Sequence, residues 1–135
     1  MMNELSVFDG VCGCIRETLE KELPDIAESD RLIADLGADS LDMLDLVFRL
    51  EQKFGISINP RDIERRTQAI LGDEPVMVEG CYTALAVEEL RKALPEVPAE
   101  EFTPGMPAAN LMASFRVKTI MNLVAFSQAN EGSTL

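Results

Sequence analysis

The chain has 135 residues, 47% of them apolar, and its 24 acidic and 12 basic residues give a net charge of −12. This length and apolar content indicate one domain with a substantial core and exclude disorder throughout the chain. The acidic excess argues against nucleic-acid binding and against binding to anionic membranes, and it favours basic surfaces on protein partners.

Residue types needed for common catalytic and metal sites are missing or scarce. The sequence has no His and three Cys, which removes the usual general base, the Ser-His triad and the commonest zinc ligand. Cys12 and Cys14 point to different faces of a predicted helix, so they are not a metal-binding pair. An odd number of cysteines is also unlike a secreted disulfide scaffold. We therefore expect inert thiols, no metal site and no enzyme.

The N-terminal stretch MMNELSVFDG has no positive charge before its apolar residues, so it does not resemble a signal peptide. No uncharged apolar run approaches the ~20 residues that a transmembrane helix needs. These features predict a cytoplasmic protein without membrane insertion.

Apolar residues at helical spacing predict a first helix that begins at Asn3 or Ser6 and ends at Lys21. These residues are Phe8, Val11, Cys12, Ile15 and Leu19. Gly10 and Gly13 would each weaken this helix by ~1 kcal/mol, which is either tolerated or required for close packing. Pro24 follows as a stop signal, and a long connection over residues 24–39 carries several apolar residues that can attach it to a core.

A second helix is predicted over residues 40–54, with capping residues at both ends. Asp39 is a good N-cap residue, because its carboxylate can accept hydrogen bonds from the first backbone N–H groups. Asp42 lies in the first turn, where the helix dipole favours negative charge. Gly55 stands where a left-handed glycine ends many helices.

The remainder of the chain is also predicted to be helical, with loops between the helices. Asn59-Pro60 indicates the start of a short helix over residues 61–71, which carries a basic cluster of Arg61, Arg65 and Arg66. Residues 72–80 and 95–107 are rich in Gly or Pro and are expected to be loops. Further helices are predicted over residues 83–94 and 117–128, and a polar tail over 130–135. No stretch indicates a strand.

The second helix carries two apolar faces when its residues are placed at 100° per residue. The larger is an ordinary core stripe, made by Met43, Leu46, Val47, Leu50 and Phe54. The smaller contains Leu41 and Phe48, with Leu44 at its margin, and is flanked by Asp45 and Glu51. A second face either packs under other segments or binds a partner.

The residues at the start of this helix resemble the attachment motif of acyl carrier proteins. Residues 36–42 read LGADSLD, which is similar to the phosphopantetheine attachment site of that family. The strong resemblance covers residues 35–58. A weaker resemblance extends to residues 3–58 and 115–128.

The resemblance implies that Ser40, flanked by Asp39 and Leu41, is the substrate of a phosphopantetheinyl transferase. That enzyme would attach 4′-phosphopantetheine from coenzyme A, and the arm would carry acyl groups as thioesters. Further partners would be acyl-processing enzymes such as ketosynthases and acyltransferases, and we expect a monomer. The positions that match the family's partner-recognition helix are Leu41, Asp42, Asp45, Phe48 and Glu51. The positions that could line an acyl pocket are Met43, Leu46, Val47 and Leu50, although ordinary core packing is by itself the better explanation for each of them.

The chain departs from the family's pattern by carrying extra residues between the second and closing helices. We expect an all-α fold: an acyl-carrier-type four-helix bundle in a single domain, with residues 1–58 and a closing helix over 115–129 interrupted by a helical insertion over 59–114. The insertion could enlarge an apolar pocket with Met77, Met106 and Met112, select a partner through its arginine cluster, or be a decorative helix pair.

The function predicted from the sequence is an acyl carrier in a specialised fatty acid, lipid or polyketide pathway. A peptidyl carrier would use the same attachment serine, and only the group on the arm would distinguish it. An acidic helical adaptor that binds proteins without a prosthetic group is the alternative from another class.

Overall fold

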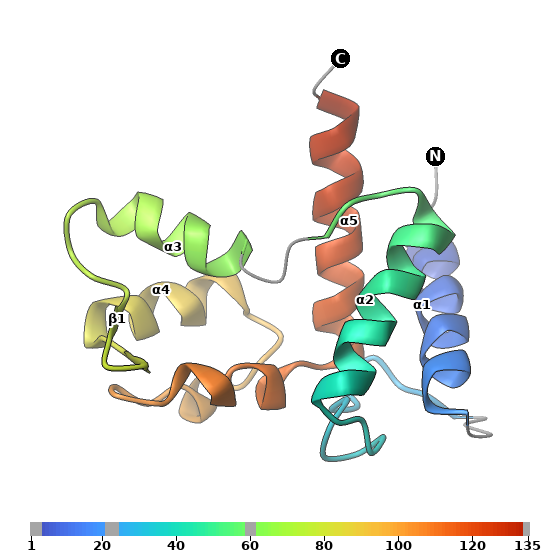
Figure 1. Cartoon of the computed structure of the whole chain (residues 1–135), viewed down its shortest axis with the longest axis horizontal. Coiled ribbons are helices and arrows are strands. Elements are labelled where there is room, and N and C mark those ends of the chain that lie inside the picture. Colours follow the sequence, from blue (N-terminus) through green and yellow to red (C-terminus); the bar gives the residue numbers. More distant parts are fainter. Residues whose placement is uncertain (1–3, 21–24, 59–61, 134–135) are drawn as a thin grey trace. The chain divides into compact units, whose positions relative to one another are not determined.

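The computed structural model describes residues 4–20, 25–58 and 62–133 (Figure 1). These residues form five α-helices, three short 3₁₀ turns and one two-stranded hairpin. The chain divides into two compact units, Met1–Ile58 with Phe115–Leu135 and Asn59–Ser114. The expectation of a helical bundle is confirmed, because helices make up most of the described residues and each strand has two residues.

The first unit is built from three long helices that run alongside one another in Figure 1. They are α1 (Glu4–Leu19), α2 (Ser40–Phe54) and α5 (Val117–Ser133), and α1 packs against both of the others. Each helix contributes fully buried apolar side chains to the core, among them Ile15, Leu50 and Val124. Apolar side chains spaced three or four residues apart lie on one face of each helix, and their burial holds the helices together.

Backbone hydrogen bonds attach the connection between α1 and α2 to the start of α5. Leu32 N–H donates to Phe115 O at 3.1 Å, and Val117 N–H donates to Asp30 O at 3.0 Å. The buried Leu32 side chain reinforces this attachment. Lys118 lies in the first turn of α5, an unfavourable place for a cation, and its ammonium group pairs with the Glu28 carboxylate at 3.5 Å.

The two glycines of α1 differ in their surroundings. A Cβ atom added at Gly10 would lie 2.5 Å from Cζ of Phe54, whereas one added at Gly13 would meet nothing within 4 Å. Gly10 therefore permits close approach of α1 and α2, and Gly13 is only tolerated.

Alanine at these two glycines should have opposite effects on stability. Gly13→Ala gains helix propensity and should raise the free energy of unfolding by ~0.5–1 kcal/mol. Gly10→Ala must displace the Phe54 ring, so it should be at least ~1 kcal/mol less stable than Gly13→Ala. Urea unfolding followed by circular dichroism measures both. Equal stabilisation by the two substitutions would show that the Phe54 ring moves aside without cost.

The second unit consists of two packed helices, α3 (Asp62–Leu71) and α4 (Ala84–Ala93), with a hairpin between them in sequence. The strands β1 (Met77–Val78) and β2 (Cys81–Tyr82) are antiparallel and joined at Glu79 and Gly80, which both have positive φ. This is the backbone that a tight two-residue hairpin turn requires. The 3₁₀ turns lie at Ala99–Glu101, Ala108–Asn110 and Met112–Ser114.

Tyr82 is the largest fully buried side chain of this unit. Its hydroxyl donates a hydrogen bond to Glu64 Oε1 on α3 at 2.8 Å, which satisfies the polar end of the ring. Burial, followed by the hydrogen bond to the Glu64 carboxylate, raises the pKa of the Tyr82 hydroxyl far above its ordinary value. The hydroxyl therefore stays protonated and keeps donating across the physiological range.

Several predicted boundaries differ from the observed ones. The α1 helix ends at Leu19, before the predicted end at residue 21. The predicted stop signal at Pro24 lies outside the described residues, as does Lys21. The predicted start signal at residues 59–61 lies outside them too. The prediction of no strand is wrong for the hairpin, which begins inside the expected 72–80 loop. The closing helix continues to Ser133, beyond its predicted end and into the residues expected to form a polar tail.

Candidate functional site

Ser40 is the first residue of α2 and is exposed at the N-terminal end of the helix. The preceding residue, Asp39, is the N-cap, as the sequence predicted. Asp39 Oδ1 accepts from the N–H of Asp42 at 2.8 Å, and Asp42 Oδ2 accepts from the N–H of Asp39 at 3.0 Å. This reciprocal capping box holds the backbone on both sides of Ser40.

The groups around the Ser40 hydroxyl suit the attachment of an anionic group. Within the described part of the chain, neither the hydroxyl nor the backbone N–H groups of Ser40 and Leu41 have a hydrogen-bond partner. Free N–H groups at a helix start favour a phosphate. Ser40 is not the cap of its own helix, so its hydroxyl is available for modification without loss of the cap.

The two apolar faces of α2 differ sharply in exposure. Met43, Leu46 and Leu50 are buried, and Val47 is half-buried. In contrast, the side chains on the other face are among the most exposed large apolar residues of the described chain. Leu41, Leu44 and Phe48 are 75%, 62% and 59% exposed. We call these three residues the apolar strip.

The carboxylates predicted to bind partners all accept hydrogen bonds from this chain itself. Asp42 belongs to the capping box described above. Asp45 Oδ2 accepts from Arg49 Nε at 2.8 Å, and Glu51 Oε2 accepts from the backbone N–H of Ile58 at 2.9 Å. The structure places all three on α2, as predicted, and gives each a role within the fold.

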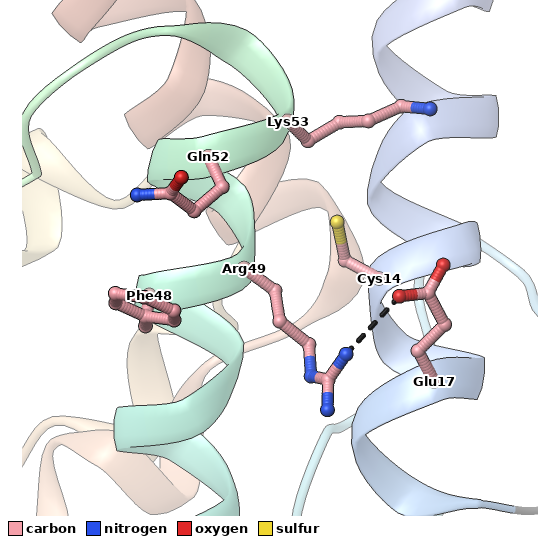
Figure 2. A pocket seen from close by; sticks show the side chains of 6 residues that line it. All are labelled: Cys14, Glu17, Phe48, Arg49, Gln52 and Lys53. Atoms are coloured by element: carbon pink, nitrogen blue, oxygen red, sulfur yellow. Dashed lines mark hydrogen bonds and ion pairs between the residues drawn. The ribbon is translucent and has the colours of Figure 1, made fainter.

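Arg49 also connects α2 to α1, a contact that the sequence analysis missed. Its Nη1 atom lies 3.1 Å from Glu17 Oε2 (Figure 2). One guanidinium therefore pairs with two carboxylates, those of Glu17 and Asp45. The hydrogen bond to Asp45, with the charges of both carboxylates, raises the pKa of the Arg49 guanidinium above its ordinary value. The spacing of Asp45 and Arg49 could have predicted their pairing. Glu17 is too distant in sequence to give such a signal.

A hollow of about 330 Å³ lies beside Phe48, between α1 and α2 (Figure 2). Its lining residues are Cys14 and Glu17 from α1, and Phe48, Arg49, Gln52 and Lys53 from α2. Burial raises the pKa of the Cys14 thiol above its ordinary value. Cys12 is also buried, and its burial raises the pKa of its thiol in the same way.

Comparisons with known proteins bear directly on this site. The family model for the phosphopantetheine attachment site matches residues 9–69, which include Ser40 and all of α2. The acyl carrier protein of Thermotoga maritima is 38% identical over 65 residues, covering 48% of this chain and 80% of the relative. The chain belongs to the acyl carrier protein family.

Two further acyl carrier proteins are similar to this chain over 65–75 residues. That of Sulfurovum is 36% identical over 75 residues, covering 56% of this chain and 97% of the relative. The acyl carrier protein AcpXL of Brucella melitensis is 43% identical over 65 residues, covering 48% of this chain and 67% of the relative. No solved structure matches the chain.

Membership of the acyl carrier protein family accounts for the general character of the site. The matched domain is where these proteins attach 4′-phosphopantetheine covalently, and they act as carriers. Family members interact with phosphopantetheinyl transferases and with acyl-processing enzymes. None of the described helices has the length and apolar character needed to cross a membrane.

The family model ends at residue 69, so most of the second unit lies outside it. The three methionines considered as pocket residues differ in burial: Met106 is buried, Met112 is half-buried and Met77 is exposed. Arg65 is exposed and lies 3.8 Å from Asp62 of its own helix.

Proposed function

We propose that Ser40 is the attachment point of 4′-phosphopantetheine and that this acyl carrier protein transports acyl groups as thioesters in a specialised fatty acid, lipid or polyketide pathway. The observation that carries the proposal is the free, exposed hydroxyl at the capped start of α2, within the LGADSLD motif. The attachment replaces the hydroxyl O–H bond by a phosphodiester O–P bond. The nucleotide portion of coenzyme A leaves, and the transferase accepts the proton.

The rest of α2 serves the same function through its two faces. Leu41, Asp42, Asp45, Phe48 and Glu51 form the surface that partner enzymes approach. The opposite face, with Met43, Leu46, Val47 and Leu50, borders the core of the first unit and is where an acyl chain would be sheltered. The protein is one carrier domain whose helical insertion occupies residues 59–114.

The proposal is tested by incubating purified apo protein with a phosphopantetheinyl transferase and coenzyme A. The expected result is a mass gain of one 4′-phosphopantetheine per chain, located by fragmentation on the peptide that contains Ser40. A known acyl carrier substrate in parallel shows that the transferase is active. Modification of another residue, or no modification by several active transferases, would refute the proposal.

A further inference from the structure

The hairpin of the second unit has one covered edge and one open edge. On the covered side, Tyr82 N–H donates to Met106 O at 2.9 Å, and Tyr82 O accepts from Gly105 N–H at 3.0 Å. A further hydrogen bond, from Ala108 N–H to Gly80 O at 2.8 Å, continues this contact beside the turn. The later segment therefore lies along β2 in the place of a third strand, and β1 is left as the edge of the sheet.

The register of the hairpin directs the backbone groups of Met77 toward the open edge. Met77 pairs with Tyr82 across the hairpin. Because the N–H and C=O of Tyr82 are bonded on the covered side, this pair is a non-hydrogen-bonded one, and the N–H and C=O of Met77 point away from β2. Within the described residues, these two groups of Met77 have no hydrogen-bond partner.

The side chains of β1 are exposed on both faces of the strand. Outside the apolar strip, the exposed large apolar side chains of the described residues all belong to the second unit, and two of them make up β1. Met77 is 39% exposed and Val78 is 55% exposed. Successive side chains of a strand point to opposite faces, so an added strand would find an apolar side chain on each face.

The open edge is held in place by the start of α4. Val76, which precedes β1, is buried, and its carbonyl accepts from Thr83 N–H at 3.0 Å. Thr83 Oγ1 donates to Pro75 O at 2.9 Å, and Thr83 is also the N-cap of α4. The hairpin and the first turn of α4 therefore lie together at one end of this unit (Figure 1). A partner meets a preformed edge and does not have to order it.

The sequence around β1 is acidic on both sides. Asp73 and Glu74 precede the strand and Glu79 follows it, and all three are exposed. Within the described residues, none of these carboxylates forms an ion pair. The chain has no Lys or Arg between Arg66 and Arg91. A segment that pairs with β1 is therefore favoured when it carries positive charge.

The same charges argue against a second copy of this chain as the occupant. If two β1 strands paired antiparallel about Met77, residue 79 of one copy would stand opposite residue 75 of the other. Glu79 of each copy would then lie diagonally across from Glu74 of the other copy. Like charges at neighbouring cross-strand positions are destabilising, and a short edge strand next to Pro75 limits self-pairing further.

We propose that β1 is a docking edge for an extended, basic segment of another protein, which adds a strand through the free N–H and C=O of Met77. Apolar side chains of that segment contact Met77 and Val78, and its Lys or Arg side chains pair with Glu74 and Glu79. The contact is small, so binding is weak and reversible. The edge lies outside the matched family model, which ends at residue 69, and the inference does not depend on the modification of Ser40.

The probe for this edge is a synthetic peptide of about ten residues in which Val and Lys alternate. It is titrated into the intact, isotope-labelled chain while the backbone amide signals are followed by NMR. The signals of Met77, Val78 and Glu79 should shift and saturate, with a dissociation constant on the order of 0.1 mM. A peptide of alternating Val and Glu is the control for charge and should bind at least about tenfold more weakly.

Met77→Pro tests the backbone contact. Proline removes the free N–H, which is not part of the hairpin ladder, and edge strands tolerate proline where the N–H faces solvent. Met77→Ala is the matched control, because it shortens the same side chain and keeps the N–H. Met77→Pro should bind the Val–Lys peptide at least about fivefold more weakly than Met77→Ala. Unchanged amide signals of β2 and α4 in both free variants show that the hairpin is intact.

A charge variant tests the edge without touching its backbone. Glu74→Gln combined with Glu79→Gln changes two exposed side chains. It should weaken binding of the Val–Lys peptide about threefold at ~20 mM NaCl and less at higher salt. This variant decides the question if Met77→Pro disturbs the hairpin.

Four results would overturn the inference. They are no shift at ~1 mM peptide, shifts confined to residues away from β1, equal affinity of Met77→Pro and Met77→Ala with the hairpin intact, and binding of the Val–Glu peptide as tight as that of the Val–Lys peptide. Concentration-dependent shifts of the β1 signals in the free protein would identify a second copy as the occupant and overturn it as well.

Discussion

Ser40→Ala is expected to abolish phosphopantetheinylation completely, with no mass gain after prolonged incubation with transferase and coenzyme A. Alanine lacks the oxygen that forms the phosphodiester bond. The fold should be unaffected, because Ser40 is exposed and its hydroxyl makes no hydrogen bond within the described residues. The helix cap is provided by Asp39, and alanine is a better helix former than serine, so the free energy of unfolding should change by less than ~0.5 kcal/mol.

A matched serine control makes this experiment specific. Ser57 is an exposed serine of the same unit, and Ser57→Ala should be modified like wild type. Circular dichroism should give the same helix content for both variants. A mass gain in Ser40→Ala would mean that the prosthetic group is attached elsewhere, and loss of helix content would mean that the test reports on folding.

Leu90→Ala is expected to have the largest effect on stability and to act on the second unit. Leu90 is fully buried on α4, which packs against α3. Removing a buried leucine side chain costs ~2–5 kcal/mol, a large part of the stability of a small helical unit. Hydrogen exchange should show lost protection in α3 and α4. Protection in α1, α2 and α5 should persist, and Ser40 should still be modified, because the first unit has its own core.

Leu85→Ala provides the comparison on the same helix. Its side chain is 51% exposed, so the same truncation should cost less than ~1 kcal/mol. If Leu90→Ala instead removed protection from all the helices together, or abolished modification of Ser40, the two units would have to fold as one cooperative structure.

The attachment helix could be predicted closely from the sequence because its signals are local. Asp39 at the N-cap and Gly55 in the left-handed conformation bound α2 at the residues predicted from them. The exposure of Leu41 and Phe48 follows from helical periodicity, since the core stripe occupies the opposite face. Leu44, placed only at the margin of the smaller face, is more exposed than Phe48.

Features that depend on distant residues could not be predicted in this way. The pairing of Arg49 with Glu17 joins residues 32 positions apart. Gly105 N–H donates to Tyr82 O, and Met106 O accepts from Tyr82 N–H. With the bond from Ala108 N–H to Gly80 O, this segment supports the hairpin from a distant part of the chain. The strand propensity of residues 72–80 gives no sign of that support, so the sequence alone predicts a loop there. The end of α5 was missed because its polar residues continue the helix without an apolar face to indicate it.

Attachment of the prosthetic group to Ser40 is tested most directly by the intact mass of the protein purified from its own cells. We expect a population of chains heavier by one 4′-phosphopantetheine, with or without a thioester-bound acyl group, and fragmentation should locate the addition on Ser40. Every molecule unmodified at Ser40 would contradict it.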